Sequence, residues 1–521
     1  MKKTIFAIPI ILLSILILAC TFAETFAGQT QSGSDAETRE TSQNSEFSES
    51  NQTTLGNEEL TNGVYLFSPI TSTDTYLMDA DGAAVYTWTS DYSPGHSVYL
   101  LENGNLLRTG KFTTGVFDAG GSGGIVQEIA PDSTIVWEYQ YASEQVQQHH
   151  DIEQMPNGNI LMIAWEYKTK AEAILAGRDP NLLKDGELWP DHIVEVDPTT
   201  NQIVWEWHTW DHLVQDYHPT RENYGVVAEH PELIDVNFTS RQSPADWNHT
   251  NAIDYNAELD QILLSVHNFS EIWIIDHNTT TEKAAGPAGD LLYRWGNPQA
   301  YDAGTATDQQ LYVQHDARWI PSEYPGEGYI LVFNNGDRNL RAYSSIDEIV
   351  TPINPDGSYT LTSGSAFGPE APIWSFMADN PTDFYADHVS GAQRLSNGNT
   401  LICDGVHGIF FEVTPDGETV WSYVYGGDVF RVTQIASNYP GLTFLNLQSG
   451  ETLKGEPRGT GGTQGPSTGS GQDNQRHQKA VEACFGLTES AACTIQNPNK
   501  TVSGSCQIKQ SELACVPENR P

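Results

Sequence analysis

Short runs in which apolar and polar residues alternate recur along most of the chain, and many of them end at turns rich in Asn and Gly. Alternation with a period of two predicts β-strands, and Asn-Gly turns predict hairpins between them. The pattern is clearest in the unit that starts at His150. It predicts four consecutive strands, from His150 to the turn Asn157-Gly158 and then at 160–167, 192–196 and 202–207.

Two phrases repeat together with this unit. The first is a histidine placed about seven residues before the end of a predicted first strand, at His96, His150, His249, His315 and His388, with Arg431 in the sixth position. The second is an aromatic, any residue, an aromatic, at 86–88, 137–139, 205–207, 293–295, 374–376 and 421–423. Repetition of short strands at intervals of about 40 to 50 residues is the signature of a β-propeller. Six copies predict six blades.

The repeated histidines are predicted to lie close together. The first strand of each propeller blade is the innermost one, so residues at the starts of these strands form a ring at one mouth of the central channel. The two longest insertions, 168–191 and 208–248, fall on the same face as these strand starts. Long loops on a rigid scaffold are where function is most often found.

Composition divides the chain of 521 residues into segments. Lys2 and Lys3 followed by an apolar run predict a signal peptide at 1–19. Cys20 follows a lipobox-like phrase and is predicted to be lipidated; the alternative is ordinary cleavage after Ala23 or Ala27. A polar, acidic tether at 20–62 then leads to the predicted propeller at 63–447.

The last part of the chain differs from the rest. A linker rich in Gly, Ser and Thr spans 448–475, and a module with four cysteines spans 476–521. In an exported tail, four cysteines predict two disulfides in one of three pairings, among Cys484, Cys493, Cys506 and Cys515. A zinc site with four thiolates is the alternative, although the paired spacing typical of such sites is absent. We therefore expect an all-β chain: a six-bladed propeller with loop insertions on one face and a small disulfide-rich C-terminal module.

The net charge of −43 excludes a basic footprint for nucleic acid. An anionic substrate would be repelled overall, so a site for one must gather local positive charge. The histidine ring suits three chemistries: a metal site supplemented by Asp151 and Asp316, acid–base catalysis, or nucleophilic catalysis. No H-x3-H or HExxH spacing supports a metal, and no phosphate loop or nucleotide fingerprint occurs.

Three phrases resemble the bacterial arylsulfate sulfotransferases: His150-Asp151 before Pro156-Asn157-Gly158-Asn159, then Asp246-Trp247-Asn248-His249-Thr250-Asn251, then Gln314-His315. The resemblance implies a propeller without cofactors that moves a sulfuryl group from a phenolic sulfate ester to a phenolic acceptor, without a nucleotide donor. It implies a sulfohistidine intermediate with His315 as the nucleophile, and it matches His150, His249 and Asn251 to other catalytic residues.

The chain departs from the family pattern at one catalytic position, because His267 stands where the family has an arginine. Our hypothesis is that Arg431, or else Arg318, neutralises the sulfuryl charge. We expect His96, His267, Arg318 and His388 to contact substrate. Cys403 is the only cysteine in the predicted propeller, so the disulfide that some relatives have near the nucleophile cannot form there.

The predicted location is outside the cytoplasm, as a periplasmic or cell-surface lipoprotein that meets the membrane only through Cys20. Two other functions remain open from the sequence. A binding propeller without catalysis would use loop aromatics such as Trp189 and Tyr217. A metal-dependent hydrolase or lyase would use the histidine ring. Within the sulfotransferase interpretation itself, a sulfatase-like relative would use water in place of phenol as the acceptor.

Overall fold

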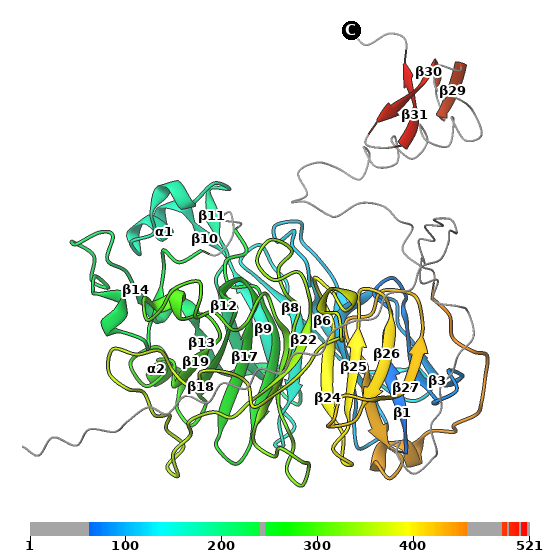
Figure 1. Ribbon diagram of the computed structural model, residues 1–521, viewed down its shortest axis with the longest axis horizontal. Coiled ribbons are helices and arrows are strands. Elements are labelled where there is room, and N and C mark those ends of the chain that lie inside the picture. Colours follow the sequence, from blue (N-terminus) through cyan, green and yellow to red (C-terminus); the bar gives the residue numbers. More distant parts are fainter. Residues whose placement is uncertain (1–61, 240–244, 456–491, 498–499, 510–511, 518–521) are drawn as a thin grey trace, which may run out of the picture. The chain divides into compact units, whose positions relative to one another are not determined.

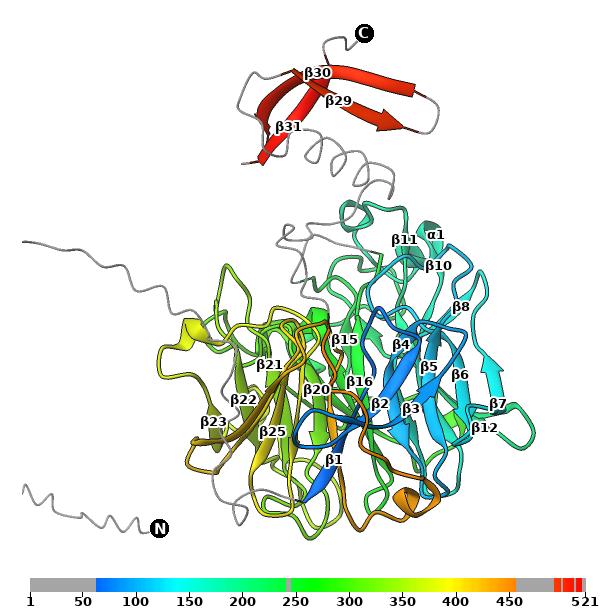
Figure 2. The same ribbon diagram turned by 90° about the vertical axis from the view of Figure 1, so that its right-hand side faces the viewer.

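The computed structural model describes residues 62–239, 245–455, 492–497, 500–509 and 512–517. Between residues 62 and 455 it contains six four-stranded antiparallel sheets arranged as the blades of a propeller (Figure 1, Figure 2). The all-β, six-bladed fold predicted from the repeats is therefore confirmed.

Each blade runs from an inner to an outer strand in hydrogen-bonded order. The first three blades are β28 (Thr433–Ala436), β1 (Gly63–Phe67), β2 (Asp74–Met78), β3 (Ala84–Thr89); β4 (Pro94–Leu100), β5 (Leu106–Lys111), β6 (Gly124–Ile129), β7 (Ile135–Gln140); and β8 (Val146–Gln154), β9 (Ile160–Glu166), β12 (Asp191–Asp197), β13 (Gln202–His208). The other three are β16 (Thr250–Asn256), β17 (Gln261–Val266), β18 (Glu271–Asp276), β19 (Tyr293–Trp295); β20 (His315–Trp319), β21 (Ile330–Asn334), β22 (Ser345–Ile349), β23 (Trp374–Phe376); and β24 (Gly391–Arg394), β25 (Thr400–Asp404), β26 (Ile409–Val413), β27 (Thr419–Val424).

The ring of blades is closed by one mixed blade. Its inner strand, β28, comes from the end of the propeller and pairs antiparallel with β1 from the beginning, with Gly63 opposite Ala436. Closing the circle in this way covers the inner edge of β1 and joins the two ends of the propeller in one sheet. It also places Arg431, just before β28, at the inner strand of this blade, as the sequence repeat predicted.

Aromatic side chains fill the spaces between blades. Trp88, Trp165, Trp207 and Trp273 are almost completely buried. The ring of Tyr65 on β1 stacks on Trp421 with centroids 4.4 Å apart, which joins the first blade to the last. Burying about 150 to 250 Å² for each such ring makes these contacts a dominant part of the stability. The inner strands are therefore held firmly in place.

The two predicted insertions lie together on one face. The first holds β10 (Lys168–Thr169), α1 (Lys170–Leu175), η1 (Pro180–Leu182) and β11 (Glu187–Leu188), and the second holds η2 (Thr209–Asp211), β14 (Leu213–Val214), η3 (Val227–Glu229) and β15 (Ile234–Asp235). Both views place α1, β10 and β11 beyond the strand ends (Figure 1, Figure 2). The backbone N–H of Trp189 donates to the carbonyl of Ala245 at 2.7 Å, so the insertions support each other.

The opposite face is less uniform than the sequence suggested. Long connections follow β18 and β22, at 277–292 and 350–373, and the first contains α2 (Thr281–Ala284). Elsewhere in the propeller, the remaining short 3₁₀ helices are η4 (His267–Phe269), η5 (Pro298–Tyr301), η6 (Pro381–Asp383) and η7 (Pro440–Phe444). No helix in the described residues is long and apolar enough to cross a membrane.

A separate three-stranded sheet, β29 (Ala492–Asn497), β30 (Lys500–Lys509) and β31 (Glu512–Pro517), forms part of the predicted C-terminal module. In the backbone register Cys506 pairs with Cys515. Cys484 lies outside the described residues, as do residues 1–61 with the predicted signal peptide, Cys20 and most of the tether. The predicted disulfides and lipid anchor therefore stay predictions.

Candidate active site

Five imidazoles form a continuous arc, four at the inner strands and the fifth, His267, in η4 directly after β17. The ring centroids are 5.5 Å apart for His96 and His150, 4.6 Å for His150 and His249, 4.9 Å for His249 and His267, and 5.2 Å for His267 and His315. His388 is near enough to lower the pKa of both His96 and His315 through its charge. The structure thus brings together the predicted ring of histidines, with His267 as an additional member.

The inner strands are distorted at these histidines. His96, His150 and His249 have positive φ angles of 104°, 51° and 53°. The pairing of β8 with β9 shifts register between Gln148 and Ile152, so His150 lies in a bulge inside a strand that begins earlier than predicted, at Val146. Bulges redirect side chains and are common beside active sites. Here they aim the repeated imidazoles at the same space.

A fixed hydrogen bond sets the tautomer of His315. The amide Nδ2 of Asn335 donates to the carbonyls of Ala386 and Val389, at 2.8 and 3.0 Å, so its Oδ1 must accept. The Nδ1–H of His315 donates to this oxygen at 2.8 Å. Nε2 of His315 therefore carries the lone pair and is the nitrogen that can act within the histidine arc.

Burial keeps most of the arc uncharged. Loss of solvation, together with the charges of neighbouring imidazoles, lowers the pKa of His315 and of His96 to about 3. The same cause holds the pKa of His150 well below its ordinary value. An unprotonated imidazole has the lone pair that a nucleophile needs, so His315 requires no base to free that lone pair at neutral pH.

His249 is held by a carboxylate. Its Nδ1 hydrogen-bonds to Oδ2 of Asp246, whose Oδ1 accepts from the indole of Trp165 at 2.8 Å. Asn251, predicted to be catalytic, donates through Nδ2 to the carbonyl of Gln314 at 2.7 Å. It therefore holds the backbone next to His315, which the sequence did not indicate.

A glycine-rich segment, Gly120-Gly121-Ser122-Gly123-Gly124, passes directly over His150. A Cβ added to Gly121 would lie 1.9 Å from Cε1 of that imidazole, and Gly121 has a φ of +79°. Its carbonyl also accepts from the backbone N–H of His150 at 2.7 Å. Only glycine allows this approach.

Gly121→Ala is expected to reduce turnover at least about 10²-fold, because the imidazole must move by more than the roughly 1 Å that such geometry tolerates. The matched control is Gly158→Ala, since Gly158 has a similar φ of +87° with nothing within 4 Å of an added Cβ. Both variants should lose a modest amount of stability from the positive φ, and Gly121→Ala should lose more, because its added Cβ meets the buried imidazole of His150. Steady-state rates and melting temperatures of the two proteins check this, and equal rates would contradict it.

Two arginines lie beside the ring in a charged network. Arg431 donates to both oxygens of Asp151, at 2.8 and 2.6 Å, and to Asp316 at 3.1 Å. Arg318 donates to Asp316 at 2.7 Å and to the hydroxyl of Tyr99 at 2.9 Å. Burial alone would raise the pKa of Asp151, but the charge and hydrogen bonds of Arg431 outweigh it and lower the pKa. The charge of Arg431 is thus matched by carboxylates.

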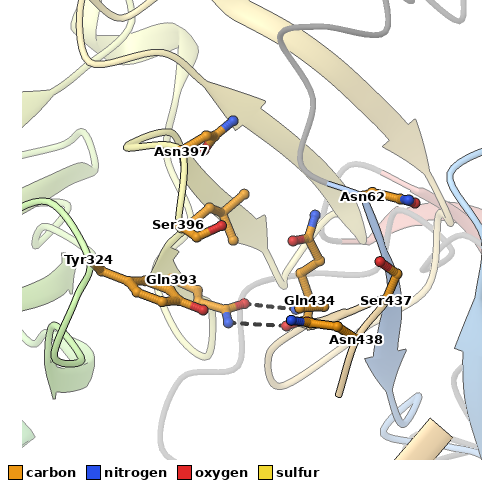
Figure 3. A pocket seen from close by; sticks show the side chains of 10 residues that line it. Asn62, Tyr324, Gln393, Ser396, Asn397, Gln434, Ser437 and Asn438 are labelled. Atoms are coloured by element: carbon orange, nitrogen blue, oxygen red, sulfur yellow. Dashed lines mark hydrogen bonds between the residues drawn. The ribbon is translucent and has the colours of Figure 1, made fainter. Parts of the chain in front are cut away.

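Within the described residues, no three His, Cys, Asp or Glu side chains converge in a way that would hold a metal ion. A pocket of about 470 Å³ lies elsewhere, near the other ends of the inner strands β24 and β28 (Figure 3). The side chain of Gln393 hydrogen-bonds there to the backbone carbonyl and N–H of Gln434, at 3.2 and 2.7 Å, and Tyr324 and Asn397 add further polar groups. None of the ring histidines lines it.

The sequence profile of the Arylsulfotransferase (ASST) family matches residues 49–432, which is most of the chain. The chain belongs to this family. Family membership implies that it is a sulfotransferase acting on aryl sulfates. No curated protein matches the chain at a significant level.

Solved structures with a similar fold are distant from this arylsulfotransferase-family chain. They include a protein of unknown function from Bacteroides caccae, with 12% identity, a TM-score of 0.40, and coverage of 72% of this chain and 99% of that chain. Virginiamycin B lyase from Staphylococcus aureus has 10% identity, a TM-score of 0.32, and coverage of 70% and 85%. Kuenenia stuttgartiensis hydrazine synthase has 10% identity, a TM-score of 0.32, and coverage of 56% and 71%.

Several site residues of this family member were missed by sequence reasoning. Asp246 and Asn335 hold ring histidines, and Gly121 covers His150. The run of four glycines around Ser122 was a usable signal, because it has no role in an ordinary strand. A lone Asn or Asp in a loop carries no such signal until the fold shows what it contacts.

Proposed function

We propose that the chain transfers a sulfuryl group from an aryl sulfate to a phenolic acceptor in two steps through a sulfohistidine at His315. The observation that carries this proposal is the His315–Asn335 pair. It combines a buried, neutral imidazole with an Nδ1–H fixed at 2.8 Å from an amide oxygen, which leaves Nε2 as the nucleophilic atom.

In the first step, Nε2 of His315 attacks sulfur while the bond between sulfur and the aryl oxygen breaks. The product is a sulfated imidazolium, whose Nδ1–H stays hydrogen-bonded to Asn335, and a phenolate that must receive a proton. In the second step, an acceptor phenol gives up its proton and its oxygen attacks the same sulfur. Each step displaces one group in line through a loose, charge-spread transition state, so positioned donors contribute most.

The sulfate oxygens need local positive charge in a chain whose net charge is −43. The charges of Lys111 and Arg431 both lower the pKa of His96, so a positive potential reaches this part of the arc. Neutral imidazole N–H groups add hydrogen-bond donors. We propose that these together replace the arginine whose position His267 occupies, and that no cofactor takes part.

The location and the tail complete the proposal, and both rest on the sequence. We propose export as a periplasmic or cell-surface lipoprotein, anchored through Cys20, with disulfides among the four C-terminal cysteines. The substrates are then phenols and aryl sulfates that reach the cell from outside.

Intact-protein mass spectrometry after brief mixing with 4-nitrophenyl sulfate tests the transfer step. The expected result is a mass increase of about 80 Da, the mass of SO₃. Peptide mapping should place it on His315, and added phenol should discharge it. Discharge by water at the same rate as by phenol would identify a sulfatase. Absence of both the adduct and released nitrophenol would overturn the proposal.

A further inference from the structure

Behind His150 a second histidine and a carboxylate form a buried chain that the proposed steps do not use. Nδ1 of His149 lies 2.8 Å from Nδ1 of His150, and Nε2 of His149 lies 3.2 Å from Oδ1 of Asp191. The exposed fractions of the three residues are 0%, 3% and 2%. Each adjacent pair is within hydrogen-bond reach, so the three groups form a continuous path from the protein interior to the arc.

The side chains of His149 and Asp191 are held rigidly. The imidazole of His149 stacks on Trp165 with centroids 4.0 Å apart and an angle of 11° between planes. Oδ2 of Asp191 accepts from the backbone N–H of Thr250 at 2.6 Å, and its own N–H donates to Oδ1 of Asn248 at 3.0 Å. Asp191 thereby joins the third blade to the strand that follows His249.

The positions of the hydrogens along the path from Asp191 to His150 follow from the proton on Asp191. Burial, with the nearby charge of Asp246, raises the pKa of Asp191 to about 8. The other ionisable groups that face it are His149 and His249, and His149 is neutral because burial lowers its pKa to about 3. A protonated Asp191 donates to Nε2 of His149, whose Nδ1–H then donates to Nδ1 of His150. This order leaves the Nε2–H of His150 pointing to the arc.

The arc cannot easily supply a proton by itself, because burial disfavours an imidazolium there. A relay avoids this charge, since a neutral imidazole gives a proton from one nitrogen while it takes another on the second nitrogen. This is the physical need that the His149–Asp191 pair meets.

We infer that Asp191 and His149 are positioning residues that deliver a proton through His150 to the departing phenolate and take it back from the acceptor phenol. This inference rests on the proposed sulfuryl transfer. In the first step the phenolate takes the proton from Nε2 of His150, Nδ1 of His150 takes one from His149, and Nε2 of His149 takes one from Asp191. The net change is phenol released, His315 sulfated and Asp191 ionised. The second step reverses every proton transfer.

The test compares two sulfuryl donors whose leaving phenolates differ in their need for a proton. Asp191→Asn keeps the shape and both hydrogen bonds, because Nδ2–H donates to His149 and Oδ1 accepts from Thr250, but it cannot release a proton. With 4-methylphenyl sulfate, whose phenolate is strongly basic, the first step should slow at least about 10²-fold. With 4-nitrophenyl sulfate, whose phenolate is stable, it should change less than about threefold, and His315 should still be sulfated.

A pH profile and a second variant complete the test. The wild-type rate with 4-methylphenyl sulfate should fall as pH rises through about 8, where Asp191 ionises, and Asp191→Asn should lack this limb. His149→Phe, which keeps the stack on Trp165, should show the same dependence on the donor. The control is His277→Gln, since His277 also has partners at both ring nitrogens, Asp260 at 2.7 Å and Glu195 at 3.0 Å, but lies outside the arc.

Equal slowing with both donors would show a merely structural role and overturn the inference, as would no slowing with either. If wild-type protein transfers from neither donor, the proposed function fails instead, so the two failures are distinct.

Discussion

Replacing His315 with alanine is expected to lower the release of nitrophenol from 4-nitrophenyl sulfate by at least about 10⁴-fold, because no other group can take its covalent role. The expectation depends on the geometry of Nε2. His315 is 3% exposed, and Asn335, pinned by two backbone carbonyls, holds the ring in one tautomer. Stopped-flow measurement of the burst phase gives the rate of this step directly.

The matched control for this loss is His407→Gln. The Nδ1 of His407, like that of His315, has a side-chain oxygen as partner, here Asp404 at 2.8 Å, but the His407 side chain is 54% exposed and is not part of the arc. Its rate should equal that of the wild type. Should His315→Ala retain more than about a tenth of the burst rate, the nucleophile is another residue. A melting temperature close to that of the wild type would show that the loss is chemical.

The fold could be predicted from the sequence because each blade of a propeller carries the same sequence pattern. The aromatic phrase marks outer strands such as β13 and β27, and each histidine marks an inner strand, so errors in one blade are corrected by the others. Insertions did not disturb this reading, since those at 168–191 and 208–248 leave the phase of the flanking strands intact. Strand starts were less accurate: Val146 rather than His150 begins β8, because backbone pairing continues on both sides of the bulge.

The histidines that face the arc were predictable, and the groups behind them were not. Periodicity identifies His150, because a histidine recurs at this position in five of the six blades, whereas its neighbour His149 has no counterpart at the other positions. Asp191 is the first residue of β12, at the end of the first insertion, and Asp246 lies near the end of the second insertion, so neither belongs to the repeated inner-strand position. Such contacts depend on loop conformations that no repeat specifies.

The same distinction applies to charge. From sequence, Arg431 occupies a ring position and is the natural candidate to bind the sulfuryl group. The structure adds that both its Nη atoms are engaged by Asp151 and that it also donates to Asp316. A cation paired in this way contributes a positive electrostatic potential to the site, while its hydrogen bonds hold the inner strands together. Its effect on stability therefore distinguishes the two roles.

Arg431→Met is expected to reduce the unfolding free energy by about 3 to 5 kcal/mol, because it leaves the buried carboxylates of Asp151 and Asp316 with only Arg318 as a cation. Arg431 is 4% exposed and Asp151 is fully buried, so water does not replace the lost partner. Chemical denaturation measures the change. Arg338→Met is the control: its pair with Asp387 is 58% and 40% exposed, and such pairs contribute about 0 to 1 kcal/mol.

A double variant decides between the structural and the catalytic role of this arginine. Arg431→Met combined with Asp151→Asn removes the charge and its main partner together, so it should recover part of the stability lost in the single variant. If Arg431→Met stays within about 1 kcal/mol of the wild type yet abolishes transfer, the network is not what holds the inner strands. Arg431 would then act on the sulfuryl group directly, as its place in the sequence repeat first suggested. The expected loss of stability, with recovery in the double variant, instead makes the arginine the link that joins the mixed blade across the channel to β8 and β20, the strands bearing Asp151 and Asp316.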